Sequence, residues 1–314
     1  MAEMARPVAP PNLPALVKAA FDKARVNGDV TYYPTQAAVL TAGSIAFQLR
    51  YAPSLAFKPK APKPKEPNGK PFNPFENPTP AMLVAELPPS HRLVLNKFAI
   101  VPEHFILITK EFKPQTHVLE KEDIDATWAC IQAYGEDLFA FFNSGPHSGA
   151  SQPHRHLQLL SIKRMRDGLE DVEHGSQWSV LAETLAGLSR KQLPFNVFTT
   201  SMRPDMSAEE RHGAYLELYR HAVKAVYPDG EVRSEGEAQI SYNFAMTSSI
   251  MALCPRTAEG VMLKKKTGED IGQVSLNGTV LAGTALVKNQ AEWDALREDP
   301  STLLDVLKGI GLPP

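Results

Sequence analysis

The chain has 314 residues, of which 43% are hydrophobic, and a formal net charge of −2. This length and composition predict a globular protein of one large or two ordinary domains, and the balanced charge gives no general attraction to nucleic acid or an anionic membrane. The only two cysteines, Cys130 and Cys254, exclude a disulfide framework and a four-cysteine zinc site, so two buried free thiols are expected. No signal-like apolar segment opens the chain, and no window reaches the roughly 18 apolar residues of a membrane span, which predicts a cytoplasmic protein.

The first elements predicted along the chain are a helix and a strand. Apolar residues recur at helical spacing over residues 14–25, and Gly28 is in place for a C-cap. Residues 45–51 favour a strand. Residues 58–80 then interleave lysines with prolines, so we expect a mobile extended loop there. Its two ends are candidates for contacting a ligand: Lys58 and Asn73-Pro74-Phe75.

The middle of the chain predicts a strand pair, a helix and a further strand. Residues 92–97 and residues 98–109 are predicted to form an antiparallel pair of strands, with the turn at Pro102-Glu103-His104. Residues 124–134 have helical periodicity and begin after Glu122-Asp123, where acidic side chains favour a helix N-terminus. Residues 138–142 favour a strand that enters the sheet.

The C-terminal third begins with a capping box, Ser207 to Glu210, that predicts a long helix. Strands are predicted over residues 240–247, 250–253, 260–263 and 280–287, and a closing helix over residues 292–307. Strands grouped with strands predict the α+β class with an antiparallel sheet flanked by helices. We divide the chain into an N-terminal part, residues 1–190, and a C-terminal part, residues 191–314, that completes the sheet.

The segment from Asn143 to Gln158 contains the strongest functional signal. Its small residues leave backbone N–H groups open to an anion, as in a phosphate-binding loop. The loop leads into His154, His156 and Gln158, which alternate along the chain. If these three residues lie on one strand, the period of two places their side chains on the same face.

Two histidines at this spacing are compatible with a metal site, a nucleophile with a positioning partner, or an exposed strand edge. A zinc site needs further ligands, and His147 is the only additional candidate nearby. A neutral imidazole is a good nucleophile toward phosphorus near pH 7, because its ordinary pKa is about 6.5. The neighbouring loop and Gln158 would meet the developing charge with oriented N–H groups, so we favour nucleotidyl or phosphoryl transfer without a bound metal.

These residues resemble the active-site strand of the histidine-triad superfamily, in the His-x-His-x-Gln form of its transferase branch. Asn96-Lys97-Phe98, Val101-Pro102-x-His104, Lys113-Pro-Gln-Thr-His117 and Ser148-Gly-Ala-Ser-Gln152 extend the likeness to the fungal type of diadenosine tetraphosphate phosphorylases (ATP adenylyltransferases). The resemblance covers about residues 42–288. It implies a histidine-triad-like fold and cleavage of diadenosine tetraphosphate with phosphate to ATP and ADP through an adenylyl-histidine.

The resemblance also implies roles for individual residues. His156 is the expected nucleophile, Gln158 the expected contact of the transferred phosphate, and His154 either a positioning group or a proton donor. The expected substrate-binding residues are Lys58, Asn96, Lys97, Asn143, Ser148, Gly149, Ala150, Ser151, Gln152, Asn277, Gly278, Thr279, Thr284 and Lys288. His91, His104 and His117 are expected to be structural.

Several points of the implied activity stay open. The chain has Asn277-Gly-Thr-Val and Thr284 where the family tends to have Asn-Ser-Leu-Gly and a methionine, and Lys288 is equally well explained as a solvated strand end. A histidine-triad hydrolase is the alternative enzyme, although it would have histidine in place of Gln158. A uridylyltransferase fits less well, and a non-catalytic dinucleotide-binding module is the third reading. The expected partners are small nucleotides and phosphate, with Mg²⁺ as an optional counter-ion of the substrate.

Overall fold

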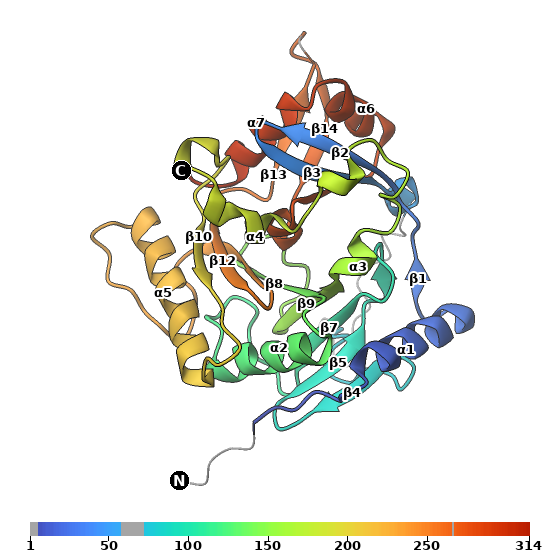
Figure 1. Cartoon of the computed structure of the whole chain (residues 1–314), viewed down its shortest axis with the longest axis vertical. Coiled ribbons are helices and arrows are strands. Elements are labelled where there is room, and N and C mark those ends of the chain that lie inside the picture. The colour runs from blue at the N-terminus through green and yellow to red at the C-terminus, as the bar shows by residue number, and fades with distance from the viewer. Residues whose placement is uncertain (1–5, 58–71, 266) are drawn as a thin grey trace.

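The computed structural model describes residues 6–57, 72–265 and 267–314, and its centre is an eight-stranded sheet. All neighbouring strands in this sheet are antiparallel, which confirms the predicted α+β class (Figure 1). In spatial order the strands are β10 (Phe198–Ser201), β12 (Ile250–Arg256), β11 (Ser241–Met246), β8 (Leu138–Ser144), β9 (His156–Ser161), β7 (Phe105–Thr109), β5 (His91–Leu95) and β4 (Leu83–Leu87).

Three smaller sheets complete the β-structure. The three-stranded one contains β15 (Thr284–Val287), β3 (Ile45–Tyr51) and β2 (Gln36–Ala42). The two-stranded ones pair β13 (Gly260–Lys264) with β14 (Asp270–Ser275), and β1 (Thr31–Tyr32) with β6 (Phe98–Ala99). The helices are α1 (Leu13–Asn27), α2 (Lys121–Ala133), α3 (Ile162–Met165), α4 (Leu181–Thr184), α5 (Ala208–Val226), α6 (Gln290–Glu298) and α7 (Ser301–Ile310). Among them, none has both the length and the apolarity to cross a membrane in the part of the chain that is described.

Both faces of the large sheet are buried. Strand β8 shows this directly, because Phe139 and Phe141 join one apolar core while Leu138, Ala140 and Phe142 join the other. Helices α1, α2 and α5 contribute to the second core, whereas α4, α6, α7, the three-stranded sheet and the β13–β14 pair contribute to the first. Figure 1 shows α6 and α7 gathered with β2, β3, β13 and β14 at one end of the molecule, away from α1.

The helix ends follow the signals in the sequence. Helix α1 ends at Gly28, whose φ of 80° is the left-handed conformation that glycine adopts without steric cost. Helix α5 begins at Ser207, whose side chain accepts from the backbone of Glu210 while the Glu210 side chain accepts in return, as in the predicted capping box. Both cysteines are buried and free, as expected.

Four predicted elements are wrong in extent. The strand predicted over residues 98–109 is divided into β6 and β7 by a turn over residues 100–104. The closing helix is broken into α6 and α7, because Pro300 has no N–H to donate and Asp299 takes an extended backbone. Residues 280–283 belong to a 3-10 turn, η5 (Gly278–Ala282), and its left-handed Gly283, so the last strand begins only at Thr284. The strand of the histidines begins at His156, and His154 makes only an isolated bridge to Pro114.

Candidate active site

Strand β9 places His156 and Gln158 side by side on one face of the large sheet. Leu157 and Leu159 point to the opposite face, into the core beneath α2 and α5. This is the alternation predicted from the sequence for these residues. The partner strand β7 lies on one side, with Ile108 opposite His156.

His156 is held as a neutral ring. Its Nδ1 lies 2.8 Å from the carbonyl oxygen of His154, which can only accept, so Nδ1 carries the proton and Nε2 keeps its lone pair. Burial lowers the pKa of His156 to about 4, while the bond to His154 opposes this shift. A ring in this state is a nucleophile at neutral pH.

His154 uses both ring nitrogens inside the protein. The backbone N–H of Phe75 donates to Oδ1 of Asn73 (3.0 Å), which turns the Asn73 Nδ2 toward Nδ1 of His154 (2.9 Å). Nδ1 therefore accepts, and Nε2 carries the proton that it donates to the carbonyl oxygen of Thr109 at 2.9 Å. Burial lowers the pKa of His154, so this ring is also neutral.

Aromatic rings cover the two histidines. The ring centroid of Phe75 lies 5.0 Å from that of His156 and 6.0 Å from that of His154, and Phe112 contacts His154 at 5.4 Å. His156 is only 3% exposed as a result. The segment Asn73-Pro74-Phe75 thus lies at the site, as expected for this end of the lysine–proline segment, while Lys58 lies outside the described residues.

His104 belongs to the site, although the sequence suggested a merely structural role. The backbone N–H of Phe98 donates to Oδ1 of Asn96 (3.0 Å), and the Asn96 Nδ2 lies 3.1 Å from Nδ1 of His104. Burial lowers the pKa of His104 to about 4, and a hydrogen bond with the Gln158 side chain opposes this shift. A ring that accepts at Nδ1 donates at Nε2, so the carbonyl end of the Gln158 amide faces His104 and its NH₂ end is available to a ligand.

The loop after β8 packs against the turn at Asn277-Gly278. Oδ1 of Asn143 accepts from the backbone N–H of Gly278 at 2.8 Å. Gly149 has a φ of +79°, and a Cβ there would lie 2.8 Å from Cβ of Asn277, so only glycine allows this approach. Ser148 is buried, and its Oγ donates to the carbonyl of Gly145 at 2.7 Å. These predicted residues therefore meet in one place.

The other predicted substrate-binding residues are placed less uniformly. Ala150 and Ser151 are exposed and Gln152 is half-buried on the same loop. Thr279 donates to Oδ1 of Asn277, capping η5. The Thr279 hydroxyl also reaches the carbonyl of Thr284 at 3.3 Å.

Thr284 is buried, and its hydroxyl lies 3.4 Å from Oε1 of Gln48. Of the three predicted lysines, the two within the described residues, Lys97 and Lys288, are exposed. Lys97 has its Nζ 5.9 Å from the ring centroid of Phe98, and Lys288 lies just after β15. Neither lysine is placed at the histidines by a hydrogen bond.

Gln115 contacts the site, although no role was expected for it from the sequence. Its Oε1 accepts from the backbone N–H of His156 (2.8 Å), and its Nε2 donates to the carbonyls of His156 (3.1 Å) and Asn143 (2.9 Å). The ladder between β8 and β9 runs as far as Phe141 and Gln158, and continuing that register would pair Asn143 with His156. The Gln115 amide takes the place of this pair and bridges two strands that have parted.

Replacing Gln115 with alanine is expected to lower the free energy of unfolding by about 2 to 4 kcal/mol, because buried backbone groups of His156 and Asn143 lose their partners. Urea denaturation measures this change. Gln290→Ala removes an exposed glutamine and should leave stability unchanged. Equal stability of the two variants would show that the parted strands do not depend on the amide.

Arg155, which lies between the two histidines, belongs to an ion-pair network on the opposite side of this segment. Nη1 of Arg155 lies 2.8 Å from Asp123 and 2.9 Å from Glu120, and Asp123 also bonds Nε2 of His91 at 3.0 Å. Burial alone would raise the pKa of Asp123, but the bond to His91 and the charge of Arg155 together lower it. His91 therefore contacts the network beneath α2 rather than the catalytic face.

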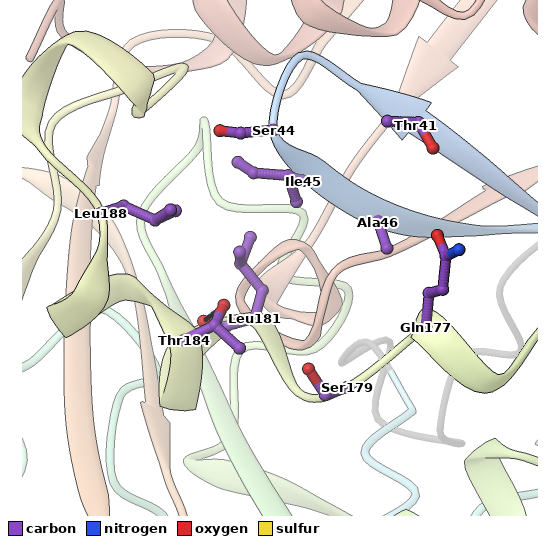
Figure 2. Close-up of a pocket in the computed structure, with 9 residues that line it drawn as sticks. All are labelled: Thr41, Ser44, Ile45, Ala46, Gln177, Ser179, Leu181, Thr184 and Leu188. Atoms are coloured by element: carbon purple, nitrogen blue, oxygen red, sulfur yellow. Dashed lines mark hydrogen bonds between the residues drawn. The ribbon is translucent and has the colours of Figure 1, made fainter. Parts of the chain in front are cut away.

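Two features of the structure bear on alternative sites. No group of three or more histidine, cysteine or acidic side chains arranged for a metal ion occurs within residues 6–57, 72–265 and 267–314. A cavity of about 280 Å³ lies between the tip of the β2–β3 hairpin and the segment around α4 (Figure 2). Its lining contains no charged side chain and none of the candidate site residues: Thr41, Ser44, Ile45, Ala46, Gln177, Ser179, Leu181, Thr184 and Leu188.

Known proteins resemble the chain over nearly its whole length. Diadenosine 5',5'''-P1,P4-tetraphosphate phosphorylase 2 of Saccharomyces cerevisiae is 28% identical, with 96% of this chain and 95% of that protein covered. Protein APA1 of the same yeast is 24% identical, with 97% and 95% covered. The crystal structure of yeast Ap4A phosphorylase Apa2 in complex with Ap4A has the same fold, with a TM-score of 0.77 at 23% identity and 99% of each chain covered.

Two family models account for most of the sequence. One is described as the Ap4A phosphorylase N-terminal domain and matches residues 3–171, more than half of the 314 residues. The other is described as the ATP adenylyltransferase C-terminal domain and matches residues 191–313. The chain belongs to the Ap4A phosphorylase (ATP adenylyltransferase) family, as its His-x-His-x-Gln segment predicted.

Proposed function

We propose that the chain is a nucleotidyltransferase that cleaves diadenosine tetraphosphate (Ap4A) with inorganic phosphate to ATP and ADP. The observation that carries this proposal is the neutral His156, whose Nδ1–H is held by a carbonyl while Nε2 keeps its lone pair. The predicted phosphate loop, residues 145–152, and Gln158 would supply N–H donors to a phosphate at this nitrogen. We name Ap4A as the substrate because the chain belongs to this family and the yeast relative is known in complex with Ap4A.

In the first step Nε2 of His156 attacks the phosphorus that carries one adenosine. The bond from this phosphorus to its bridging oxygen breaks, and ATP leaves with the electron pair. The adenylylated ring is then cationic, and the carbonyl of His154 stabilises it through Nδ1–H. In the second step an oxygen of inorganic phosphate attacks the same phosphorus, the bond to Nε2 breaks, and ADP forms.

Gln158 and the loop meet the charge on the phosphorus oxygens in both steps. With its carbonyl end on His104, Gln158 donates N–H groups to a non-bridging oxygen. His154 acts as a positioning group, because its ring nitrogens are bonded to Asn73 and Thr109. The remaining residues implied by the family, including Lys58, Lys97 and Lys288, would bind the rest of the dinucleotide.

Product analysis with and without phosphate tests the proposed reaction. ATP and ADP in equal amounts, formed only with phosphate present, are the expected outcome. AMP released at the full rate without phosphate would instead make the chain a histidine-triad hydrolase. Binding of Ap4A without any product would make it a non-catalytic module.

The pH dependence of adenylylation follows from the state of His156. Because its pKa in the folded protein is about 4, the ring stays unprotonated, and therefore nucleophilic, well below neutral pH. The single-turnover rate of adduct formation should be flat from about pH 8 to about pH 5.5 and should fall as the pH drops through about 4. A rate that already halves near the ordinary histidine value of about 6.5 would contradict this state. Circular dichroism at each pH separates this effect from acid unfolding.

The proposal extends to partners and location. Substrates are small nucleotides rather than nucleic acid, since the formal charge of −2 gives no basic surface excess. Mg²⁺ would enter as a counter-ion of the polyphosphate, and the protein would act in the cytoplasm. Replacing Mg²⁺ with EDTA in the product assay tests the first point, and fractionation of cells tests the second.

A further inference from the structure

Arg256 is a buried arginine at the end of β12. It is 4% exposed, and within the described ranges it makes no ion pair. Its Nε and Nη2 donate to backbone carbonyls of the C-terminal part: Ile310 at 3.2 Å, Ala258 at 2.9 Å, Glu259 at 3.0 Å and Leu276 at 3.0 Å. Its Nη1 donates to a side chain, Oδ1 of Asn243.

The guanidinium determines the direction of the Asn243 amide. Arginine has donors and no acceptor, so only the oxygen of that amide can face Arg256. The nitrogen of Asn243 must then face the other way, where it donates to Oδ1 of Asn143 at 2.9 Å and to the carbonyl of Ser148 at 2.9 Å. Arg256 therefore acts on the phosphate loop without touching it.

The same reasoning determines the Asn143 amide. Its oxygen accepts from Asn243 and from the backbone N–H of Gly278 at 2.8 Å, which occupies both lone pairs. Only the NH₂ group of the Asn143 side chain is therefore available to a ligand. The Gln115 amide bridges the backbones of Asn143 and His156, and both residues continue the face of the sheet on which Phe141 lies opposite Gln158, so this NH₂ group is on the same face as the candidate nucleophile.

We propose that Arg256 and Asn243 are positioning residues that hold the Asn143 amide with its nitrogen toward the phosphate of the nucleotide. The inference rests on the proposed function, because it assigns the ligand of Asn143 as a phosphate oxygen. An inverted amide would direct a carbonyl oxygen at an anion, where it repels instead of donating. The buried guanidinium of Arg256 thus determines, through the side-chain amides of Asn243 and Asn143, that an N–H donor and not an oxygen faces the phosphate.

Asn243→Asp is the main test, with AMP binding measured by calorimetry. The new carboxylate keeps the contact with Arg256 but has no N–H for Asn143, so the Asn143 amide inverts to donate to it. We expect AMP affinity to fall about 10- to 100-fold, the range for a hydrogen bond to a charged group. Unchanged AMP affinity would overturn the inference.

A double-mutant cycle shows whether the effect passes through Asn143. In an Asn143→Ala background, adding Asn243→Asp should weaken AMP binding by less than about threefold, because there is no amide left to invert. An equal loss in both backgrounds would overturn the relay, since Asn243 would then act by loosening the fold.

Arg256→Lys provides a second approach, with Arg211→Lys as its matched control. Arg211 is also buried, at 5% exposed, but it pairs with Asp125 on α2, away from the site. AMP affinity should fall in Arg256→Lys and stay at the wild-type value in Arg211→Lys, and an equal fall in both would count against the inference. If Arg256→Lys does not fold, Asn243→Asp decides alone.

The binding assay separates this inference from the proposed reaction. A wild type that binds AMP but forms no ATP and ADP from Ap4A would refute the proposed function, and the variant affinities would still decide the relay. A wild type that does not bind AMP would overturn the relay itself.

Discussion

Replacing His156 with alanine is expected to remove the covalent AMP adduct and to slow Ap4A cleavage roughly 10⁴- to 10⁶-fold, as for other enzymes that lose their nucleophile. Without Nε2 there is no atom to accept the adenylyl group, and the remaining amides can bind the substrate but cannot split the reaction into two steps. The wild type, incubated with Ap4A in the absence of phosphate, should gain one AMP per chain. Intact-protein mass spectrometry after quenching at alkaline pH detects this acid-labile bond.

Two comparisons make the His156 result specific. His221→Ala removes an exposed histidine of α5 and should leave adduct and turnover unchanged. His154→Ala should slow adenylylation without abolishing it, because the backbone carbonyl that holds Nδ1 of His156 remains. An adduct that persists in His156→Ala would place the nucleophile elsewhere. An unmodified wild type under single-turnover conditions would falsify the covalent route.

Replacing Arg155 with methionine is expected to lower the free energy of unfolding by about 3 to 5 kcal/mol. Methionine fills much of the same volume, so the loss comes from Asp123, which stays buried and charged with only His91 and the backbone N–H of Glu120 as its hydrogen-bond partners. Urea denaturation of the two proteins gives the difference. Arg220→Met, which breaks the exposed pair with Glu217, should cause no measurable change.

The acid dependence of stability gives an independent view of the Arg155 network. The pKa of Asp123 is lowered in the folded state, so its contribution is complete above the unfolded value of about 3.9 and is lost as the pH falls through the lower folded value. Removing Arg155 should weaken this dependence, because the charge that favours the ionised carboxylate is gone. A wild-type profile and an Arg155→Met profile of the same shape would show that the ion pair does not stabilise the fold.

Most of the fold could be predicted from local signals. The capping box at Ser207, the glycine at the end of α1 and the alternation of β9 each depend on neighbouring residues, and each is confirmed. The break of the closing helix at Pro300 has a local cause, whereas the start of the histidine strand is decided by a distant partner. His154 has a strand-like position in the sequence, but the backbone N–H of Arg155 donates to the carbonyl of Lys113 at 2.7 Å, so the ladder begins two residues later, at His156.

His156 could be singled out as the candidate nucleophile because loop, histidines and glutamine are continuous in the sequence, and its role stays a prediction. Gln115, Asn243 and Arg256 could not, since they reach the site from other elements through single side-chain amides or a guanidinium. His104 was also missed, because only the pairing of β7 with β9 brings it to Gln158. A polar residue on a strand gives no local sign of which side chain it will meet. The roles of the predicted substrate-binding residues stay predictions.

Between the two half-reactions, water competes with phosphate for the adenylyl group on the enzyme. The Phe75 ring, whose centroid lies 5.0 Å from that of His156, helps to leave this histidine only 3% exposed. An apolar cover of this kind lowers the local concentration of water around a reactive intermediate, whereas a phosphate ion would be drawn in by the N–H donors of the site. The partition of the intermediate between ADP and AMP would therefore be set by an aromatic side chain, even though this side chain takes no part in bond making.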